Sequence, residues 1–335
     1  MALEPKIVDG ERGRKNAAAD FLQYPSNMNF DRQQLETFAV VAETRHFGRA
    51  AIALNVTRGA VSQRIIALEE AFGTPLLVRD GMMPTPAGEM LLRHVQALQL
   101  LEADTLQRIK PAEKGRARIA IAVNADSLAT WFEPVACTIA KDNFSLELIV
   151  DDQDYTLSVL TRGEAMGGVS TASSAPTGFV AEAIGEMEYE CVATPQFATA
   201  HFAEGVTLHN ILAAPAVIFN RKDGLHAIFL ERVLGFPVSG YATHFFPSPI
   251  ALLMAIRAGV GYGLVPSMQV QSLIDAGDVI SLAPQHRIAV NLYWHHWKAA
   301  PPNVQQVSEL VLHHARETLN QVTSEASHHP ASGDR

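Results

Sequence analysis

Three short runs of apolar residues at helical spacing open the patterned part of this chain. Each run places its apolar side chains on one face of a helix, as an amphipathic helix requires. In order, the runs consist of Leu35, Phe38, Val41 and Ala42, then Ala50, Ala51 and Leu54, then Val61, Ile65 and Leu68. Thr57 stands where the third helix needs an N-cap, and Gly73 stands where that helix needs a left-handed terminal residue. The last two runs therefore predict a helix-turn-helix, braced by the first.

A different pattern follows the third helix. Residues 75–84 begin and end with proline and cannot form a long helix, so they predict a two-stranded wing. From Ala87 to Ile109 a long amphipathic pattern returns, with a leucine-rich side wider than one neighbour would need. Two explanations stay open for it, a helix buried on its own domain or a helix paired with a second subunit. Pro111 and Gly115 then break the helix and mark a hinge.

Short apolar strands alternate with helical stretches from residue 116 onward. The strands are predicted at 119–123, 146–150, 216–219 and 263–265. This alternation predicts an α/β domain with a mostly parallel sheet. Ligands of such sheets bind beyond the carboxyl ends of the strands, so the residues that follow each strand are the first candidates for a binding site.

Composition places the chain among globular proteins of the cytoplasm. It has 335 residues, 48% hydrophobic and 18% charged, and a formal net charge of −9. That charge argues against a protein that coats nucleic acid generally, while a local arginine cluster suits site-specific binding. Cys137 and Cys191 lack metal-ligand spacing and suit a reducing compartment. No apolar secretion signal is visible at the start, and the longest uncharged stretch, 233–256, is too broken by prolines to span a membrane.

The outward face of the predicted helix-turn-helix is basic. Between Arg45 and Leu68 every ionised residue is an arginine, and no carboxylate interrupts them. Residues at the start of a recognition helix enter the major groove, where Arg and Gln read base edges and Ser or Thr bind bases or phosphates. An ordinary helical hairpin with a solvated face is the alternative. The residues expected to contact DNA are Arg49, Thr57, Arg58, Ser62, Gln63, Arg64 and, in the wing, Arg79.

Residues 35–88 resemble the winged helix-turn-helix of LysR-type transcriptional regulators. The matching pieces are Ala50-Ala51 with Leu54, Ala60-Val61-Ser62 with Ile65, Leu68-Glu69, Phe72-Gly73, Pro75-Leu76 with Arg79, and Thr85-Pro86-Ala87-Gly88. Two pairs depart from the family pattern. Arg58-Gly59 replaces a small residue or proline followed by a small residue, and Leu77-Val78 replaces phenylalanine and a charged residue. Gly59 lowers helix propensity, which puts the usual base preference in doubt.

The resemblance implies an architecture for nearly the whole chain. It implies an α/β protein with a DNA-binding domain at 28–88, a linker and dimerisation helix at 89–114, and an effector-binding domain at 115–320. The effector domain would resemble a periplasmic binding protein, with one lobe formed by 115–189 plus 290–320 and the other by 190–289. Residues 1–27 would be a flexible tail or an artefact of the assigned start codon, and residues 321–335 would be a disordered tail. The implied partners are double-stranded DNA bearing an interrupted palindrome, RNA polymerase, and further copies of the chain in a dimer or tetramer.

Three segments resemble the branch of LysR regulators that controls export of arginine and lysine, namely 124–131, 151–154 and 220–223. Asp126 and Asp223 follow predicted strands and suit an ammonium or side-chain cation. The alternative is that Asp126 only caps its helix and that the acidic run is a solvated loop. The expected effector-binding residues are Asn124, Asp126, Ser127, Trp131, Ser170, Thr171, Asp223, His244 and Ser248.

Enzyme chemistry finds no support in the sequence. The chain lacks a nucleophile elbow, a zinc-protease motif, a P-loop and a dinucleotide fingerprint. His295 and His296 are adjacent in a predicted strand and point to opposite faces, so they do not share a metal ion. We therefore expect no metal, no cofactor and no catalysis. A LysR regulator of another metabolite, or a small-molecule-binding protein with a merely structural helix-turn-helix, remains an alternative function.

Overall fold

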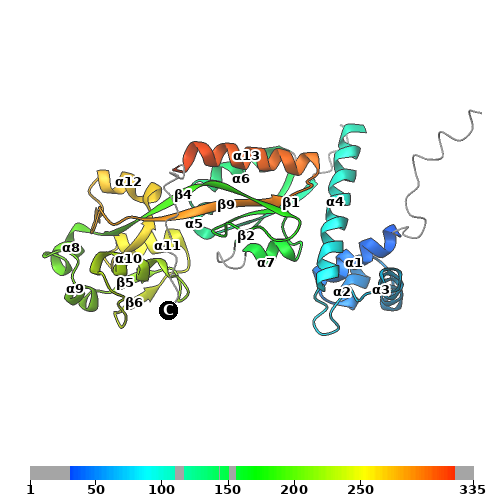
Figure 1. Ribbon diagram of the computed structural model, residues 1–335, viewed down its shortest axis with the longest axis horizontal. Coiled ribbons are helices and arrows are strands. Elements are labelled where there is room, and N and C mark those ends of the chain that lie inside the picture. The colour runs from blue at the N-terminus through cyan, green and yellow to red at the C-terminus, as the bar shows by residue number, and fades with distance from the viewer. Residues whose placement is uncertain (1–30, 110–116, 143, 151–155, 321–335) are drawn as a thin grey trace, which may run out of the picture. The chain divides into compact units, whose positions relative to one another are not determined.

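The computed structural model in Figure 1 describes residues 31–109, 117–142, 144–150 and 156–320. The chain divides into two compact units, Met1–Val95 and Gln96–Arg335. The predictions for the two tails, for the hinge at Pro111 and Gly115, and for the acidic run 151–154 lie outside the described residues.

The N-terminal unit is the predicted helical bundle. Its helices are α1 (Arg32–Thr44), α2 (Phe47–Ala53), α3 (Arg58–Phe72) and the first part of α4 (Pro86–Ile109). Thr57 caps α3, because its hydroxyl oxygen accepts a hydrogen bond from the Ala60 amide at 3.1 Å. Gly73 ends α3 with a φ of 65°, a left-handed conformation that glycine adopts without strain. Both predicted caps are confirmed.

Residues of the helix-turn-helix motif hold the wing against α3 and α4. Leu77 and Pro84 form an antiparallel bridge. Glu69 Oε1 accepts hydrogen bonds from the Leu76 and Leu77 amides at 2.7 and 3.2 Å, which ties the wing to the end of α3. Gly88 is required at the start of α4, since an added Cβ would lie 2.0 Å from the Leu76 carbonyl oxygen. Glu69 and Gly88 therefore have structural tasks here.

The two halves of α4 have different surroundings. Leu91, Leu92 and Val95 are buried with the core of the N-terminal unit. Leu101 and Leu106, farther along the helix, are 43% and 60% exposed. The first half matches a helix buried on its own domain. In the second half Leu100 is buried in the core of the C-terminal unit, while Leu101 and Leu106 leave apolar surface exposed.

The C-terminal unit contains a large mixed sheet. Its strands are β1 (Ala117–Val123), β2 (Phe144–Val150), β3 (Gly167–Ser170), β4 (Phe179–Ala193), β7 (Gly263–Pro266), β8 (Ile280–Ser281) and β9 (Ile288–Trp297). They lie in the order β2-β1-β3-β9-β4-β7, with β8 beside β4. The prediction of a mostly parallel sheet is wrong. Within the described chain β1 runs parallel to β2 and β3, whereas β9 and β4 return antiparallel across the unit.

A second, small sheet consists of two parallel strands, β5 (Ala216–Ile218) and β6 (Thr243–Phe245). Helices pack against both sheets. The helices are α5 (Ala125–Leu128), α6 (Phe132–Lys141), α7 (Thr156–Thr161), α8 (Pro195–His201), α9 (Leu208–Ala213), α10 (Leu225–Leu234), α11 (Pro249–Arg257), α12 (Ser267–Asp275) and α13 (Pro302–Thr318). Figure 1 shows α6 and α13 on one face of the sheet and α7 on the other. Two hydrophobic cores result, one around Trp131 and Trp294 and one around Val217 and Leu252. The predicted α/β class is correct.

Candidate functional site

The N-terminal unit exposes most of the residues expected to contact DNA. Arg49, Thr57, Arg58, Gln63 and Arg79 are exposed, the first on α2, the next three at and after the start of α3, and the last in the wing. No described carboxylate lies between Arg45 and Leu68, so this surface is basic. It can attract phosphates and present hydrogen-bond donors to base edges.

Arg64 differs from these exposed residues. Its guanidinium donates to Gln33 Oε1 at 3.0 Å and to Thr37 Oγ1 at 3.2 Å, both on α1. Thr37 is fully buried and its hydroxyl donates to the Gln33 carbonyl at 2.6 Å. Arg64 therefore braces α3 against α1, a task that its sequence position did not reveal. Ser62, the remaining predicted contact, is partly buried on α3.

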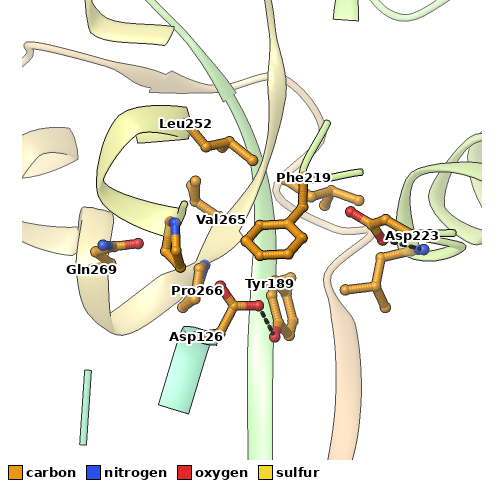
Figure 2. Close-up of a pocket in the computed structure, with 11 residues that line it drawn as sticks. Asp126, Tyr189, Phe219, Asp223, Leu252, Val265, Pro266 and Gln269 are labelled. Atoms are coloured by element: carbon orange, nitrogen blue, oxygen red, sulfur yellow. Dashed lines mark hydrogen bonds between the residues drawn. The ribbon is translucent and has the colours of Figure 1, made fainter. Parts of the chain in front are cut away.

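The C-terminal unit contains a small pocket that is partly open to solvent. Figure 2 shows the Phe219 ring near the middle of the lining residues, with Asp126 and Asp223 on different sides of it. The lining residues are Asp126, Tyr189, Phe219, Asp223, Leu225, Pro249, Leu252, Leu264, Val265, Pro266 and Gln269. A mostly apolar pocket with a few placed polar groups is typical of small-molecule sites. The structure brings the two predicted aspartates, Asp126 and Asp223, to this one pocket.

Asp126 is a buried acid of the pocket with a raised pKa. Its Oδ2 accepts a hydrogen bond from the Tyr189 hydroxyl at 2.7 Å. Burial raises the pKa of Asp126 to about 6, and the negative charge of Asp223 adds to that rise, while the Tyr189 hydrogen bond opposes it. Burial, followed by the charge of Asp126, raises the pKa of Tyr189, which stays a neutral donor. The pocket thus concentrates negative charge where water is scarce.

The loop before α10 fixes Asp223. Asn220 Oδ1 accepts hydrogen bonds from the amides of Lys222 and Asp223, at 2.7 and 3.1 Å. Asp223 Oδ1 accepts from the Leu225 amide at 2.9 Å. These bonds within a few residues hold the carboxylate at one place on the pocket wall (Figure 2).

Polar atoms are buried at the carboxyl end of β1 and beside it. Asn124 and Ser127 are 4% and 0% exposed, and neither Asn124 Oδ1 nor Ser127 Oγ has a hydrogen-bond partner in the described part of the chain. The Thr156 hydroxyl, at the start of α7, is fully buried and also has no hydrogen-bond partner among the described residues. Ser170, at the end of β3, accepts a bond from the Ala172 amide at 3.1 Å. Burying unpaired polar atoms is costly, so they point to a ligand or water.

Of the predicted effector residues, only Asp126 and Asp223 line the pocket, so Asn124, Ser127 and Ser170 lie outside its lining, as do the remaining four. Trp131 belongs to the hydrophobic core, with its ring edge-on to Phe132 at 5.4 Å. His244 is exposed on β6, and Ser248 caps α11 by accepting from the Ala251 amide at 3.4 Å. Thr171 is partly buried just after β3.

Tyr189, Phe219 and Gln269 also line the pocket and were not among the predicted residues. A signal for Tyr189 was present in the alternation of Met187, Tyr189 and Cys191 with three glutamates, which is typical of a strand with one buried face. Phe219 and Gln269 come from separate segments, and no local pattern marks them as neighbours of Asp126.

The paired histidines of β9 do point to opposite faces. His295 Nε2 lies 2.9 Å from the Ala172 carbonyl oxygen, and His296 Nε2 lies 2.8 Å from Glu182 Oε1. Among the described residues, no three His, Cys, Asp or Glu side chains gather as metal ligands would. Likewise, none of the described helices is both long and apolar enough to cross a membrane.

Two family descriptions match the chain. Residues 32–89 match the bacterial regulatory helix-turn-helix proteins of the lysR family. Residues 112–316 match the LysR substrate binding domain. The two matches correspond to the N-terminal unit and to most of the C-terminal one.

Similar proteins carry the name HTH-type transcriptional regulator ArgP. The one from Photobacterium profundum is 38% identical over 84% of this chain and 96% of its own length. The one from a strain of Pseudomonas fluorescens is 40% identical over 80% and 91%.

Solved structures agree with these relatives. The crystal structure of ArgP from Mycobacterium tuberculosis is 34% identical, with a TM-score of 0.77 over 88% of this chain and 100% of its own. Full-length LysG from Corynebacterium glutamicum with bound effector Arg is 31% identical, with a TM-score of 0.73 over 87% and 100%.

Proposed function

The chain belongs to the lysR family of bacterial transcriptional regulators, and we propose that its effector is a basic amino acid, arginine or lysine. As a regulator it binds DNA and a small molecule and has no catalytic task. The finer proposal concerns which molecule occupies the pocket, which DNA is bound and which gene is controlled.

The observation that carries the effector proposal is the acidic pair in an apolar pocket. Asp126 and Asp223 line the same pocket together with Phe219, Leu252 and other apolar residues. Mutual repulsion and burial make the two negative charges costly there. A cationic side chain offsets that repulsion, whereas a neutral ligand does not.

The amino-acid end of the ligand has candidate partners at the carboxyl ends of β1 and β3. Asn124 and Ser127 flank Asp126 and bury an acceptor oxygen and a hydroxyl group without partners in the described chain. A hydroxyl can donate to an α-carboxylate, and an amide oxygen can accept from an α-ammonium. We assign this task to Asn124, Ser127 and, at the neighbouring strand end, Ser170 and Thr171.

The relatives support the same class of effector. The LysG structure from Corynebacterium glutamicum contains arginine as its bound effector. LysG and this chain share 31% identity over most of both lengths. The ArgP relatives, at 38% and 40% identity, support it by name.

For DNA we propose that α3 enters the major groove of an interrupted palindrome. Arg58, Ser62 and Gln63 would reach base edges, while Arg49 and Arg79 bind phosphates. Two half-sites require two copies of the chain, and the exposed leucines of α4 supply an apolar surface for pairing. The output would be recruitment of RNA polymerase to an amino-acid exporter gene in the cytoplasm.

Effector binding can change this output through the strands that cross the C-terminal unit. β4 and β9 pair along nearly their whole lengths, and the pocket takes Asp126 from one side of that pair and Asp223 from the other. A ligand that bridges both aspartates favours one arrangement of the two sides. To switch the output strongly it must prefer that arrangement by several kcal/mol, about 5.5 for a shift from 1:99 to 99:1.

A footprint tests this function. The purified protein is incubated with DNA from upstream of its own gene and of neighbouring transporter genes, with arginine, lysine or leucine. We expect one protected region with two half-sites about one helical turn apart, and a change in its extent or affinity with arginine or lysine only. Protection that ignores all three amino acids would refute the effector, and no protected region would refute the DNA site.

A further inference from the structure

Tyr189 lines the pocket from β4, with its backbone fixed on both sides. Its register partner in β9 is Ile288, and its partner in β7 is Pro266. Only 2% of the residue is exposed. Because two strand ladders hold the backbone and the pocket wall encloses the ring, the hydroxyl group has little freedom to move.

The Tyr189 hydroxyl group forms a hydrogen bond with Asp126. It donates to Oδ2 at 2.7 Å, an ordinary length for an O–H···O hydrogen bond. The second carboxylate oxygen points away from Tyr189 (Figure 2). Asp126 itself belongs to α5, which has only four residues. Such a short helix gives its side chains little support, so the bond from β4 determines how this carboxylate is oriented.

We propose that Tyr189 is a positioning residue, whose hydroxyl holds the Asp126 carboxylate in the orientation that receives the cationic end of the effector. The inference rests on the proposed function, since it assigns Asp126 to an effector cation. It makes Tyr189 a determinant of the preference for charged over neutral amino acids. The alternative is that Tyr189 only fills space next to Phe219 and Pro266.

Three titratable groups face one another in this pocket, Asp126, Asp223 and Tyr189, and the half-buried Tyr241 lies within the influence of Asp223. The Tyr189 hydrogen bond lowers the pKa of Asp126 against burial and against Asp223, leaving it at about 6. Of these three influences on the pKa of Asp126, only the Tyr189 hydrogen bond stabilises the ionised carboxylate, and removing the hydroxyl group removes it. The pKa of Asp126 then rises, and a cation that needs the ionised carboxylate binds more weakly at low pH.

Calorimetric titration of the full chain with arginine and with lysine at pH 6 and pH 8 tests the proposal. With a pKa of about 6 for Asp126, wild-type affinity should fall about twofold from pH 8 to pH 6. In Tyr189→Phe the lost bond raises that pKa by about one or more, so the fall should reach about tenfold. Tyr262→Phe is the matched control, because Tyr262 is a fully buried tyrosine whose hydroxyl lies 3.3 Å from His226 Nε2, outside the pocket lining.

The outcomes separate the two hypotheses. Arginine or lysine binding by the wild type with the same pH profile in Tyr189→Phe would overturn this inference and leave the proposed function standing. Absence of binding by the wild type would overturn both. A steeper profile in Tyr189→Phe but not in Tyr262→Phe supports the inference, because a space-filling ring would leave the pH profile unchanged.

A measurement without ligand guards against misfolding. Raising the pH from about 4 to about 6 ionises Asp126 in the unfolded chain before it does so in the folded one. Stability linked to Asp126 is therefore present at low pH and lost over this interval. Tyr189→Phe should enlarge the loss in unfolding temperature, and the enlargement should vanish on an Asp126→Asn background. An enlargement that persists there would show that Tyr189 acts on another group.

Discussion

The N-terminal and C-terminal units differ in how their candidate binding residues are placed. In the N-terminal unit, Thr57 and Glu69 bond to backbone amides a few residues away, and arginines such as Arg58 stay exposed. In the C-terminal unit, Asn124 and Ser127 bury polar atoms that have no partner in the described chain. The first arrangement displays charge to a large external partner. The second leaves buried polar atoms at the carboxyl end of β1, for which we propose a small ligand as the partner.

The difference teaches where each function is vulnerable. Exposed charges act through a screened field, so single contacts are modest and depend on salt. Buried charges act in a medium of low polarity, where losing one partner of a pair is costly. We therefore expect the largest single-residue effects in the effector pocket and smaller ones in the helix-turn-helix.

Asp126→Asn should produce the largest change. It keeps the shape of the side chain but removes the charge that pairs with an effector cation. We expect arginine affinity to fall by about 2 kcal/mol or more, roughly thirtyfold, with DNA affinity in the absence of effector unchanged. Calorimetry measures the first and fluorescence anisotropy the second. Asp278→Asn, in a half-exposed pair with Arg257 at 3.1 Å, is the control and should bind arginine as wild type does.

Arg58→Ala should produce the next largest change, on the other unit. Loss of one exposed contact from α3 should lower specific DNA affinity by about 1–3 kcal/mol, with arginine binding preserved. If Arg58 binds phosphate rather than a base, the salt slope of binding should decrease by about one. Arg118→Ala is the control, since Arg118 pairs with Glu147 on the surface of the C-terminal unit. Equal DNA affinity in both variants would remove Arg58 from the DNA-binding face.

Thr57→Ala tests the cap rather than the charge. The Thr57 hydroxyl satisfies the Ala60 amide, and its loss should destabilise the N-terminal unit by about 1 kcal/mol. Thr57→Ser keeps the acceptor and should restore most of that stability. Amide exchange of α3 measures the effect locally. Unchanged exchange in the alanine variant would show that this hydrogen bond contributes nothing to α3.

Arg64→Lys should have the smallest effect. Lysine keeps the charge but cannot bridge Gln33 and Thr37 as the guanidinium does. We expect a loss of about 0.5 kcal/mol in the stability of the N-terminal unit by thermal unfolding, from one weakened polar contact. A variant with full stability that no longer binds specific DNA would contradict the bracing task and place Arg64 at the bases.

The same contrast decides what could be predicted from the sequence. The caps Thr57 and Gly73 and the wing between Leu77 and Pro84 depend on neighbours close in the chain, so local patterns predicted them. Asp126 and Asp223 were predicted individually, because each follows a strand.

The composition of the pocket could not be predicted in this way. Tyr189 reaches Asp126 from β4, which runs antiparallel to β9, and the alternation of strands and helices gave no sign of that pairing. Phe219 and Gln269 join the same lining from the end of β5 and from α12. The expected roles of Trp131, His244 and Ser248 rested on position along the chain. Packing placed the first in the core and the second on an exposed strand, and the third caps a helix.

The most direct test of the effector claim is calorimetric titration of the wild-type protein with arginine and with citrulline. Citrulline has the shape of arginine without its charge, so the comparison isolates the attraction between the ligand cation and the pair Asp126 and Asp223. We predict saturable binding of arginine and at least about thirtyfold weaker binding of citrulline. Equal affinity for the two ligands would contradict the account, because it would show that the acidic pair does not select the effector.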